Sequence, residues 1–266
     1  GTFALDANTT ANNNVAIGHG SLGENTTGTQ NTAVGALALN DNTTANNNVA
    51  IGANALEENT TGGSNTAVGT NALEANTTGA QNTAVGAFAL DANTADLNTA
   101  VGFNSQILTT TGQLNTSVGA SSLDANTTGG SNTSIGYNSL TANTTGNSNV
   151  ALGRDALAAN TTASNNTAIG KDALKANTTG NSLLAVGHSA LMTCTTVSNL
   201  TAIGFEAGKA NTTGTSLTAL GYKALTANTT GGNNTALGRD ALLVNTEGGN
   251  NTAVGGVALQ NNTGAE

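Results

Sequence analysis

Glycine recurs every 17 residues along this chain, and no other feature of the sequence restricts the fold as strongly. The series begins at Gly1 and Gly18 and runs to Gly255, with one 16-residue step between Gly86 and Gly102. A short fixed period over a whole chain is typical of solenoids, in which each repeat forms one coil that stacks on the previous coil. The sequence therefore predicts a repeat fold of about sixteen coils.

The repeat in register is N-T-A-V-G-x-x-A-L-x-A-N-T-T-G-x-x, and we number its positions 1 to 17, so that the recurring glycine is position 5. Position 4 is always Val, Ile or Leu, position 9 is almost always Leu, and positions 3 and 8 accept only Ala or Ser. Position 12 is Asn in all but two coils, where Thr109 and Cys194 replace it. These restrictions indicate which positions pack and which face water.

Each coil contains two short apolar stretches, which predict two β-strands joined by two tight bends. Period-2 alternation would point Thr32 and Val34 inward and Ala33 outward, and would bury Leu39 while Ala38 faces out. Gly, Asn and Thr are poor helix formers, which disfavours a helical hairpin repeat. Gly at positions 5 and 15 is expected to supply positive φ in the bends. We therefore expect residues 1–266 to form a single all-β array, a β-solenoid of the parallel β-roll type.

The asparagines at positions 1 and 12 would lie directly above one another in stacked coils. Such columns can hydrogen-bond amide to amide along the axis, which gives them a structural role. The alternative role is binding of sugars or ions. The Asn-Thr-Thr sequences also match the pattern of N-glycan acceptors, although turn geometry alone would select Asn-Thr-Thr-Gly.

Positions 3 and 8 never carry a large or charged residue, although they are expected to face outward. We expect a neighbouring chain or a tight stack of sheets to impose that limit, and we predict self-association on this ground. The chain also begins and ends within a repeat. We expect it to be a segment of a longer array, or a subunit whose ends are covered head to tail in a filament.

Three short motifs carry a resemblance to a known family. Asn14-Val15-Ala16-Ile17-Gly18, Asn48-Val49-Ala50-Ile51-Gly52 and Asn149-Val150-Ala151-Leu152-Gly153 resemble the head repeat of YadA-type trimeric autotransporter adhesins, as does the small residue three positions on, such as Ser21 or Ala38. The resemblance covers essentially the whole chain. It implies a left-handed parallel β-roll, a homotrimer of three chains per fibre, and a place outside a bacterial cell. Related arrays occur in phage tail fibres and surface filaments.

Catalytic, cofactor and metal sites are not expected in this chain, and we predict that it is not an enzyme. His19 and His188 lie many coils apart, and the glycine-and-aspartate nonapeptide of calcium-binding rolls is missing. With 6 Lys and Arg against 15 Asp and Glu, no basic patch favours nucleic acid. No apolar run reaches the 18 or so residues of a membrane span.

The many identical, weakly charged coils suit a rigid structural segment. Together with what the resemblance implies, they favour a structural or adhesive segment of an extracellular fibre at the cell surface, with self-association and a host or environmental surface as partners. The alternative is an ice-binding solenoid that presents a column of Asn at position 12 and Thr at position 14. Positions 6 and 7 vary most, as in Arg154-Asp155 and Tyr222-Lys223. They form either an adhesive stripe or a merely solubilising one.

The repeat changes in three successive coils, where position 1 becomes Leu183, Leu200 and Leu217. Leu184, Met192, Cys194 and Val197 lie beside them in the sequence. A patch that docks a partner is one interpretation, but a dry, repacked corner inside the roll is the one we expect. Free cysteine is usually buried, and burial of each leucine contributes roughly 1.5–3 kcal/mol.

Overall fold

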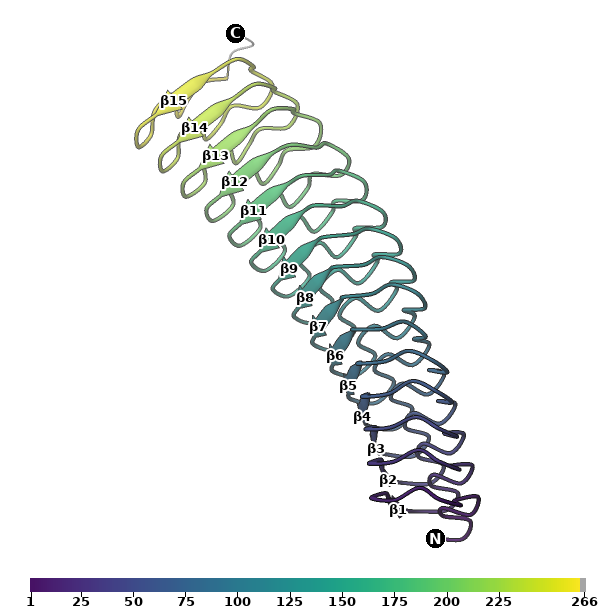
Figure 1. The fold of residues 1–266 in the computed structure, drawn as a ribbon. Coiled ribbons are helices and arrows are strands. Elements are labelled where there is room, and N and C mark those ends of the chain that lie inside the picture. Colours follow the sequence, from purple (N-terminus) through teal and green to yellow (C-terminus); the bar gives the residue numbers. More distant parts are fainter. Residues whose placement is uncertain (264–266) are drawn as a thin grey trace. The chain divides into compact units, whose positions relative to one another are not determined.

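The computed structural model describes residues 1–263 and contains one three-residue strand in each coil (Figure 1). The strands belong to two compact units, unit 1 from Gly1 to Asn132 and unit 2 from Thr133 onward. Unit 1 contains β1 (Val15–Ile17), β2 (Thr32–Val34), β3 (Val49–Ile51), β4 (Thr66–Val68), β5 (Thr83–Val85), β6 (Thr99–Val101) and β7 (Thr116–Val118). Unit 2 contains β8 (Thr133–Ile135), β9 (Val150–Leu152), β10 (Thr167–Ile169), β11 (Leu184–Val186), β12 (Thr201–Ile203), β13 (Thr218–Leu220), β14 (Thr235–Leu237) and β15 (Thr252–Val254). The described residues contain no helix.

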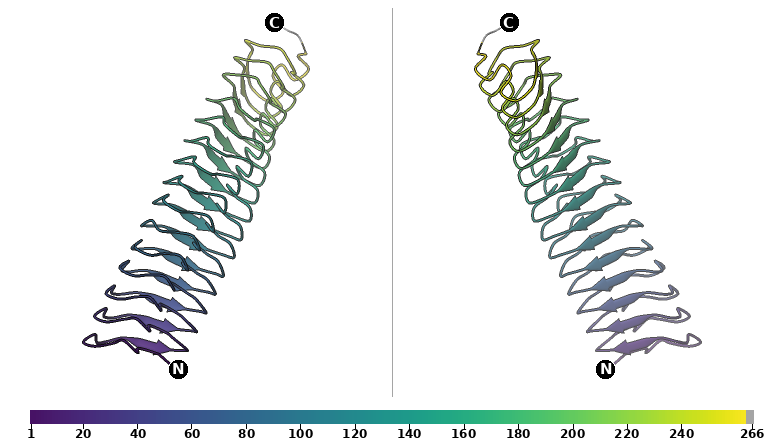
Figure 2. Two further views of the ribbon diagram at one scale, coloured as in Figure 1. Left: turned by 90° about the vertical axis from the view of Figure 1, so that its right-hand side faces the viewer. Right: turned by 90° about the vertical axis from the view of Figure 1, so that its left-hand side faces the viewer.

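Within each unit every strand pairs in parallel with the next strand in the sequence, and Figure 2 shows these strands stacked one above another. Equivalent repeat positions are partners, as in the pairing of Ala33 with Ala50 and of Val34 with Ile51. The all-β parallel β-solenoid with 17-residue coils is therefore confirmed. The described residues form fifteen strands and about fourteen complete turns, slightly fewer than the sixteen coils expected.

The 16-residue coil is absorbed in its bend. Val85 of β5 still pairs with Val101 of β6, so the strand register survives the deletion. The missing residue is the one at position 14, between Thr94 and Ala95. The Asp96 carboxylate then accepts a hydrogen bond from the Ala80 backbone N–H at 2.7 Å and holds the shortened bend to the coil before it.

The prediction of a second strand in each coil is wrong. Positions 6 to 11 form turns instead, in which residues at positions 7 and 9 have positive φ, such as Leu37 and Leu39, both at 55°. A left-handed residue reverses the side-chain alternation of an extended segment, so Ala38 and Leu39 both point inward. The turns still bond coil to coil, since the Leu39 N–H donates to the Ala55 carbonyl at 2.9 Å.

Glycine is required at position 5 for two reasons: its φ is 125° to 141°, and the backbone of the next coil lies very close. A Cβ on Gly35 would lie 2.2 Å from the carbonyl oxygen of Gly52, a distance that no packing tolerates. The prediction of positive φ at position 15 is wrong, because Ala45 and Val197 occupy that position in ordinary conformations. Where position 15 is glycine, the next coil lies close: a Cβ on Gly62 would lie 2.2 Å from the Gly79 carbonyl oxygen.

The interior is a thin layer of leucine and alanine. Leu39 at position 9 is fully buried, as predicted, but so are Ala38 at position 8 and Ala50 at position 3. The predicted orientation of the strand is therefore inverted: position 3 faces inward, while positions 2 and 4 face outward. The leucine fills the narrow space between the strand and the turn, so only a methyl group or a hydroxymethyl group fits opposite it.

This inversion removes the ground on which self-association was predicted. Small residues at positions 3 and 8 are explained by packing inside each coil, and they need no neighbouring chain. A case for association has to come from the residues that the structure places on the outside.

Two adjacent residues of β4 test this arrangement. Ala67→Leu inserts three carbons into the filled interior and should lower the free energy of unfolding by about 1–3 kcal/mol. Val68→Leu enlarges an outward side chain and should change it by less than about 0.5 kcal/mol. Urea denaturation followed by far-UV circular dichroism gives both values. Equal losses for the two variants would contradict the inverted strand.

Candidate functional surface: the outer face of the sheet

The outer face of the sheet in each unit consists of the side chains at positions 2 and 4, which we call the sheet face. Position 4 contributes Val, Ile or Leu and position 2 contributes Thr, Val or Leu in β1 to β15, without a single charged residue. Aliphatic side chains stay open to solvent, with Ile17 60% exposed in unit 1 and Leu152 42% exposed in unit 2. The exposed aliphatic residues of the sheet face are Val15, Ile17, Ile51, Val85 and Val118 in unit 1, and Ile135, Val150, Leu152, Leu220, Leu237 and Val254 in unit 2.

Other outward columns of the same coils are not restricted in this way. Position 6 carries Arg154, Lys171 and Tyr222, and position 10 carries Glu57 and Lys175. β-Propensity accounts for branched residues on a strand, but it does not forbid Tyr, Lys or Glu on an exposed one. Exposed β surfaces normally carry charges that keep them from associating. The uncharged, periodic sheet face is therefore the surface in these units that is best suited to contact another body.

The asparagine columns are internal, and their side chains are engaged within the roll. At position 12, Asn42 is buried and its Nδ2 donates to Asn25 Oδ1 at 2.9 Å and to the Ala45 carbonyl at 3.2 Å. At position 1, Asn31 Oδ1 accepts from the Asn48 backbone N–H at 2.9 Å. The structural role of both columns is confirmed, and an amide bonded in this way is not presented for sugars, ions or glycan attachment.

The burial of position 12 also argues against the ice-binding alternative. Its Thr column at position 14 is exposed, as at Thr27 and Thr44, but the Asn column at position 12 that would complete the array is buried. The hydroxyls of position 13 are turned along the axis, as where Thr26 Oγ1 donates to the Thr43 carbonyl at 3.0 Å. The single exposed column that remains is not the paired Asn and Thr surface that was expected.

Positions 6 and 7 of unit 2 form a stripe of rings and ion pairs on the exposed surface. His188, Phe205 and Tyr222 stack in three successive coils, with ring centroids 5.3 Å apart at each step. Arg154 pairs with Asp155 at 3.2 Å, and similar pairs join neighbours along the stripe. The ring faces within the stack cover one another and the cations are balanced by carboxylates, so a solubilising role accounts for this stripe.

The altered coils of unit 2 form the repacked corner that was expected. Leu183, Leu200 and Leu217 are at most 2% exposed, and Cys194 is fully buried. Burial raises the pKa of the Cys194 thiol to about 11, and its Sγ lies 3.8 Å from the Val197 carbonyl oxygen. The leucines that replace a buried asparagine column are therefore part of the interior and dock no partner.

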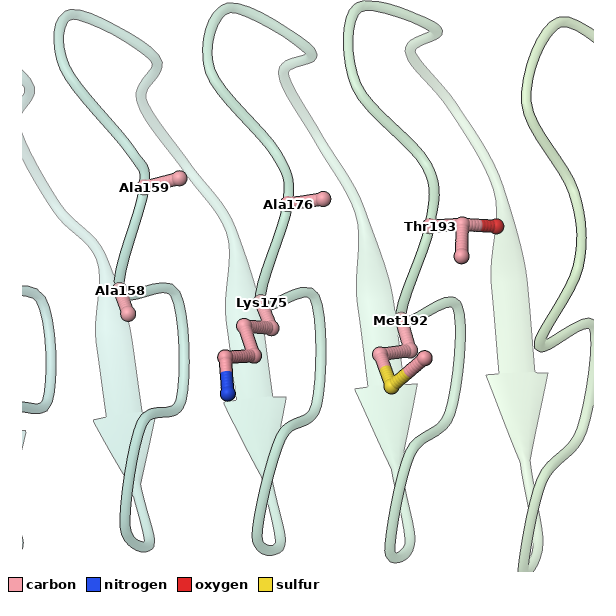
Figure 3. Close-up of a pocket in the computed structure, with 6 residues that line it drawn as sticks. All are labelled: Ala158, Ala159, Lys175, Ala176, Met192 and Thr193. Atoms are coloured by element: carbon pink, nitrogen blue, oxygen red, sulfur yellow. The ribbon is translucent and has the colours of Figure 1, made fainter.

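A shallow hollow of about 560 Å³ lies on the edge of unit 2 beside this corner (Figure 3). Lys175 and Met192 project from neighbouring coils, and the small side chains of Ala158, Ala159 and Ala176 leave the space between them open. Lys175 Nζ is already bonded to Asp172 at 2.9 Å. The hollow therefore offers a mainly apolar floor and no free polar group that would orient a ligand.

Unit 1 carries an uncompensated acidic edge, because all six Lys and Arg of the chain lie in unit 2. Its carboxylates gather at positions 10 and 11 of successive coils. Partial burial, followed by the charges of Glu74 and Glu58, raises the pKa of Asp91 to about 6. Burial and the charges of Glu74, Asp41 and Glu58 raise the pKa of Glu57 in the same way. The carboxylates of this edge repel one another, so their ionisation lowers the free energy of unfolding of unit 1.

Residues 1–263 contain no group of three or more His, Cys, Asp and Glu side chains placed to hold a metal ion. His19 and His188 lie in different units, as their separation in the sequence implied. No helix in the described chain is long and apolar enough to cross a membrane.

Comparison with known proteins adds no family: no protein-family model, curated protein or solved structure matches this chain. Function is therefore inferred from the surfaces themselves.

The acidic edge makes the stability of unit 1 depend on pH. A carboxyl group whose folded pKa is raised binds more protons in the folded state between about pH 4 and pH 6, so the free energy of unfolding falls as pH rises through that window. Asp91→Asn should therefore stabilise the protein at pH 7.5 by about 1 kcal/mol, after discounting for solvent screening. The gain should vanish near pH 2.5, which lies below both the folded and the unfolded pKa, so that Asp91 is protonated in both states.

Urea titrations at the two pH values measure this difference, and Asp91→Glu, which keeps the charge, is the control. A stabilisation that is equal at both pH values would mean that the carboxylate charge is not its cause.

Proposed function

We propose that this chain is a structural segment of an extracellular fibre whose copies associate side by side through the sheet face. The observation that carries the proposal is the uncharged aliphatic and threonine surface repeated at every strand of each unit, open to solvent in the single chain. Burial of apolar surface between copies is the favourable term, at about 25 cal/mol per Å².

The periodicity of the sheet face supports a second copy as the partner. Its side chains repeat once per strand, at the parallel-strand spacing of about 4.8 Å. A partner with the same spacing matches this face at every coil, whereas an ordinary globular surface matches it at one or two. Copies with aligned axes are the simplest bodies that satisfy that condition.

The resemblance of Asn14 to Gly18 and of its later equivalents to YadA-type head repeats supports the rest of the proposal. It favours three chains per fibre and an extracellular place at the surface of a bacterial cell. Regular coils without an oriented polar pocket suit a rigid spacer. Adhesion to a host or environmental surface would then be a property of the assembled fibre.

Charged residues placed on the sheet face should dissociate the oligomer. The double variant Val85→Lys and Val118→Lys puts two ammonium groups on the outward side of β5 and β7. We expect the native chain to sediment as an oligomer and the variant as a monomer in analytical ultracentrifugation. The matched control is Ala87→Lys with Ala120→Lys, which adds the same charge at position 6 of the same coils and should leave the oligomer intact.

Two outcomes would contradict the proposal. One is a native chain that stays monomeric at high concentration, with its sheet face free. The other is a monomeric chain that shows thermal hysteresis and shapes ice crystals, with both properties lost in the sheet-face variant. That result would make the sheet face an ice-binding surface instead.

A further inference from the structure

The short coil of unit 1 interrupts the asparagine column at position 12. In regular coils each Nδ2 donates to the Oδ1 of the coil before it, as from Asn59 to Asn42 and from Asn76 to Asn59, both at 3.1 Å. Regular asparagines also donate to the carbonyl at position 15, and Asn93, in the 16-residue coil, keeps only that bond, to the Ala95 carbonyl. Asn76 Oδ1 is left buried without a hydrogen-bond partner.

The threonine column at position 13 is interrupted at the same step. Thr60 Oγ1 donates to the Thr77 carbonyl at 2.9 Å, and Thr94 Oγ1 donates to the Thr110 carbonyl at 3.0 Å. Between these two bonds, Thr77 and Thr94 do not make the equivalent contact, although both lie in the described part of the chain. Two of the side-chain columns that tie one coil to the next are therefore missing at a single junction.

The interior of the next coil is polar. Gln106 replaces the leucine of position 9 and Ser105 replaces the alanine of position 8, and both are fully buried. Gln106 Nε2 donates to Ser117 Oγ at 2.8 Å and to the Thr99 carbonyl at 2.9 Å. Gln106 Oε1 has no partner. A buried polar atom without a hydrogen bond has lost its bonds to water and has gained none within the protein, so it destabilises the folded state.

We propose that residues 76–117 form a built-in weak point, which opens before the rest of unit 1. The missing asparagine and threonine bonds, the unpaired Asn76 and Gln106 oxygens and the polar interior all lie in these consecutive coils. The two unpaired buried oxygens gain hydrogen bonds from water when the segment opens. The aliphatic coils on its N-terminal side, which contain Leu39 and Leu56, have no such gain.

Local opening would give a fibre a defined place to yield. Backbone groups between β5 and β7 would become accessible to water and to proteases, while the remaining coils keep their stacking. The weak point belongs to unit 1 itself, so it does not depend on whether copies associate through the sheet face.

Hydrogen–deuterium exchange of the whole chain, read by mass spectrometry, tests the proposal. Amides of residues 90–117 should exchange about tenfold faster than the equivalent amides of residues 39–67, since each unpaired buried group favours opening by that order. The comparison is made within one chain, so solution conditions and oligomeric state are shared.

Two repairs should remove the difference. The triple variant Ser105→Ala, Gln106→Leu and Ser117→Ala restores the usual interior, and insertion of one Thr between Thr94 and Ala95 restores the 17-residue coil. Each should slow exchange in residues 90–117, and both together should bring it to the level of residues 39–67. Limited proteolysis should lose its preferred cuts in the same segment.

A transplant provides the matched control. Ala55→Ser, Leu56→Gln and Ala67→Ser place the same three side chains in equivalent positions of an aliphatic coil, and should create fast exchange there. Equal protection of the two segments in the native chain would overturn the proposal. So would fast exchange that persists after both repairs.

Discussion

The close contact between successive glycines at position 5 is the constraint on which the rest of this structure depends. Each glycine backbone lies so near the next coil that a Cβ would come within 2.2–2.8 Å of a carbonyl group at most of these positions, and its φ of 125° to 141° is one that other residues avoid. That contact fixes the distance between coils. Because every coil repeats it, each side chain comes to lie above its own equivalent, and one repeat position becomes one column.

Stacking in columns decides which side chains the structure can use. Asparagine suits buried columns because its amide both donates and accepts, so each residue bonds to its own kind in the next coil. Leucine at position 9 takes up the interior and leaves room for alanine or serine only. Large, branched residues of the strand are then displaced to the outside, where they form a continuous sheet face. An apolar outer surface is thus a consequence of a thin core.

The period, the parallel strands, the buried leucine and the structural asparagines were predictable from the sequence, because each repeats and each has one physical explanation. The orientation of the strand was not. Alternation shows that Thr32 and Val34 share a side, but it is equally satisfied with either side inward, and hydrophobicity favoured the wrong one. The thin interior determines which side of the strand points inward, and its thickness depends on the turn that carries Leu39. That turn was missed because leucine at positive φ leaves no trace in composition. The sheet face, which is the candidate site, was hidden by the same inversion, although the absence of charge at positions 2 and 4 was a usable signal.

The central claim is that position 3 is sealed inside each coil while position 4 is available for contact between copies. Thiol labelling at adjacent residues tests it most directly, since the native Cys194 is buried and its pKa is raised. Ala67→Cys should resist a bulky maleimide in every state of the folded protein. Val68→Cys should react rapidly in dispersed chains and become protected when they assemble. Labelling of Ala67→Cys in the folded chain, or unchanged reactivity of Val68→Cys on assembly, would contradict the account.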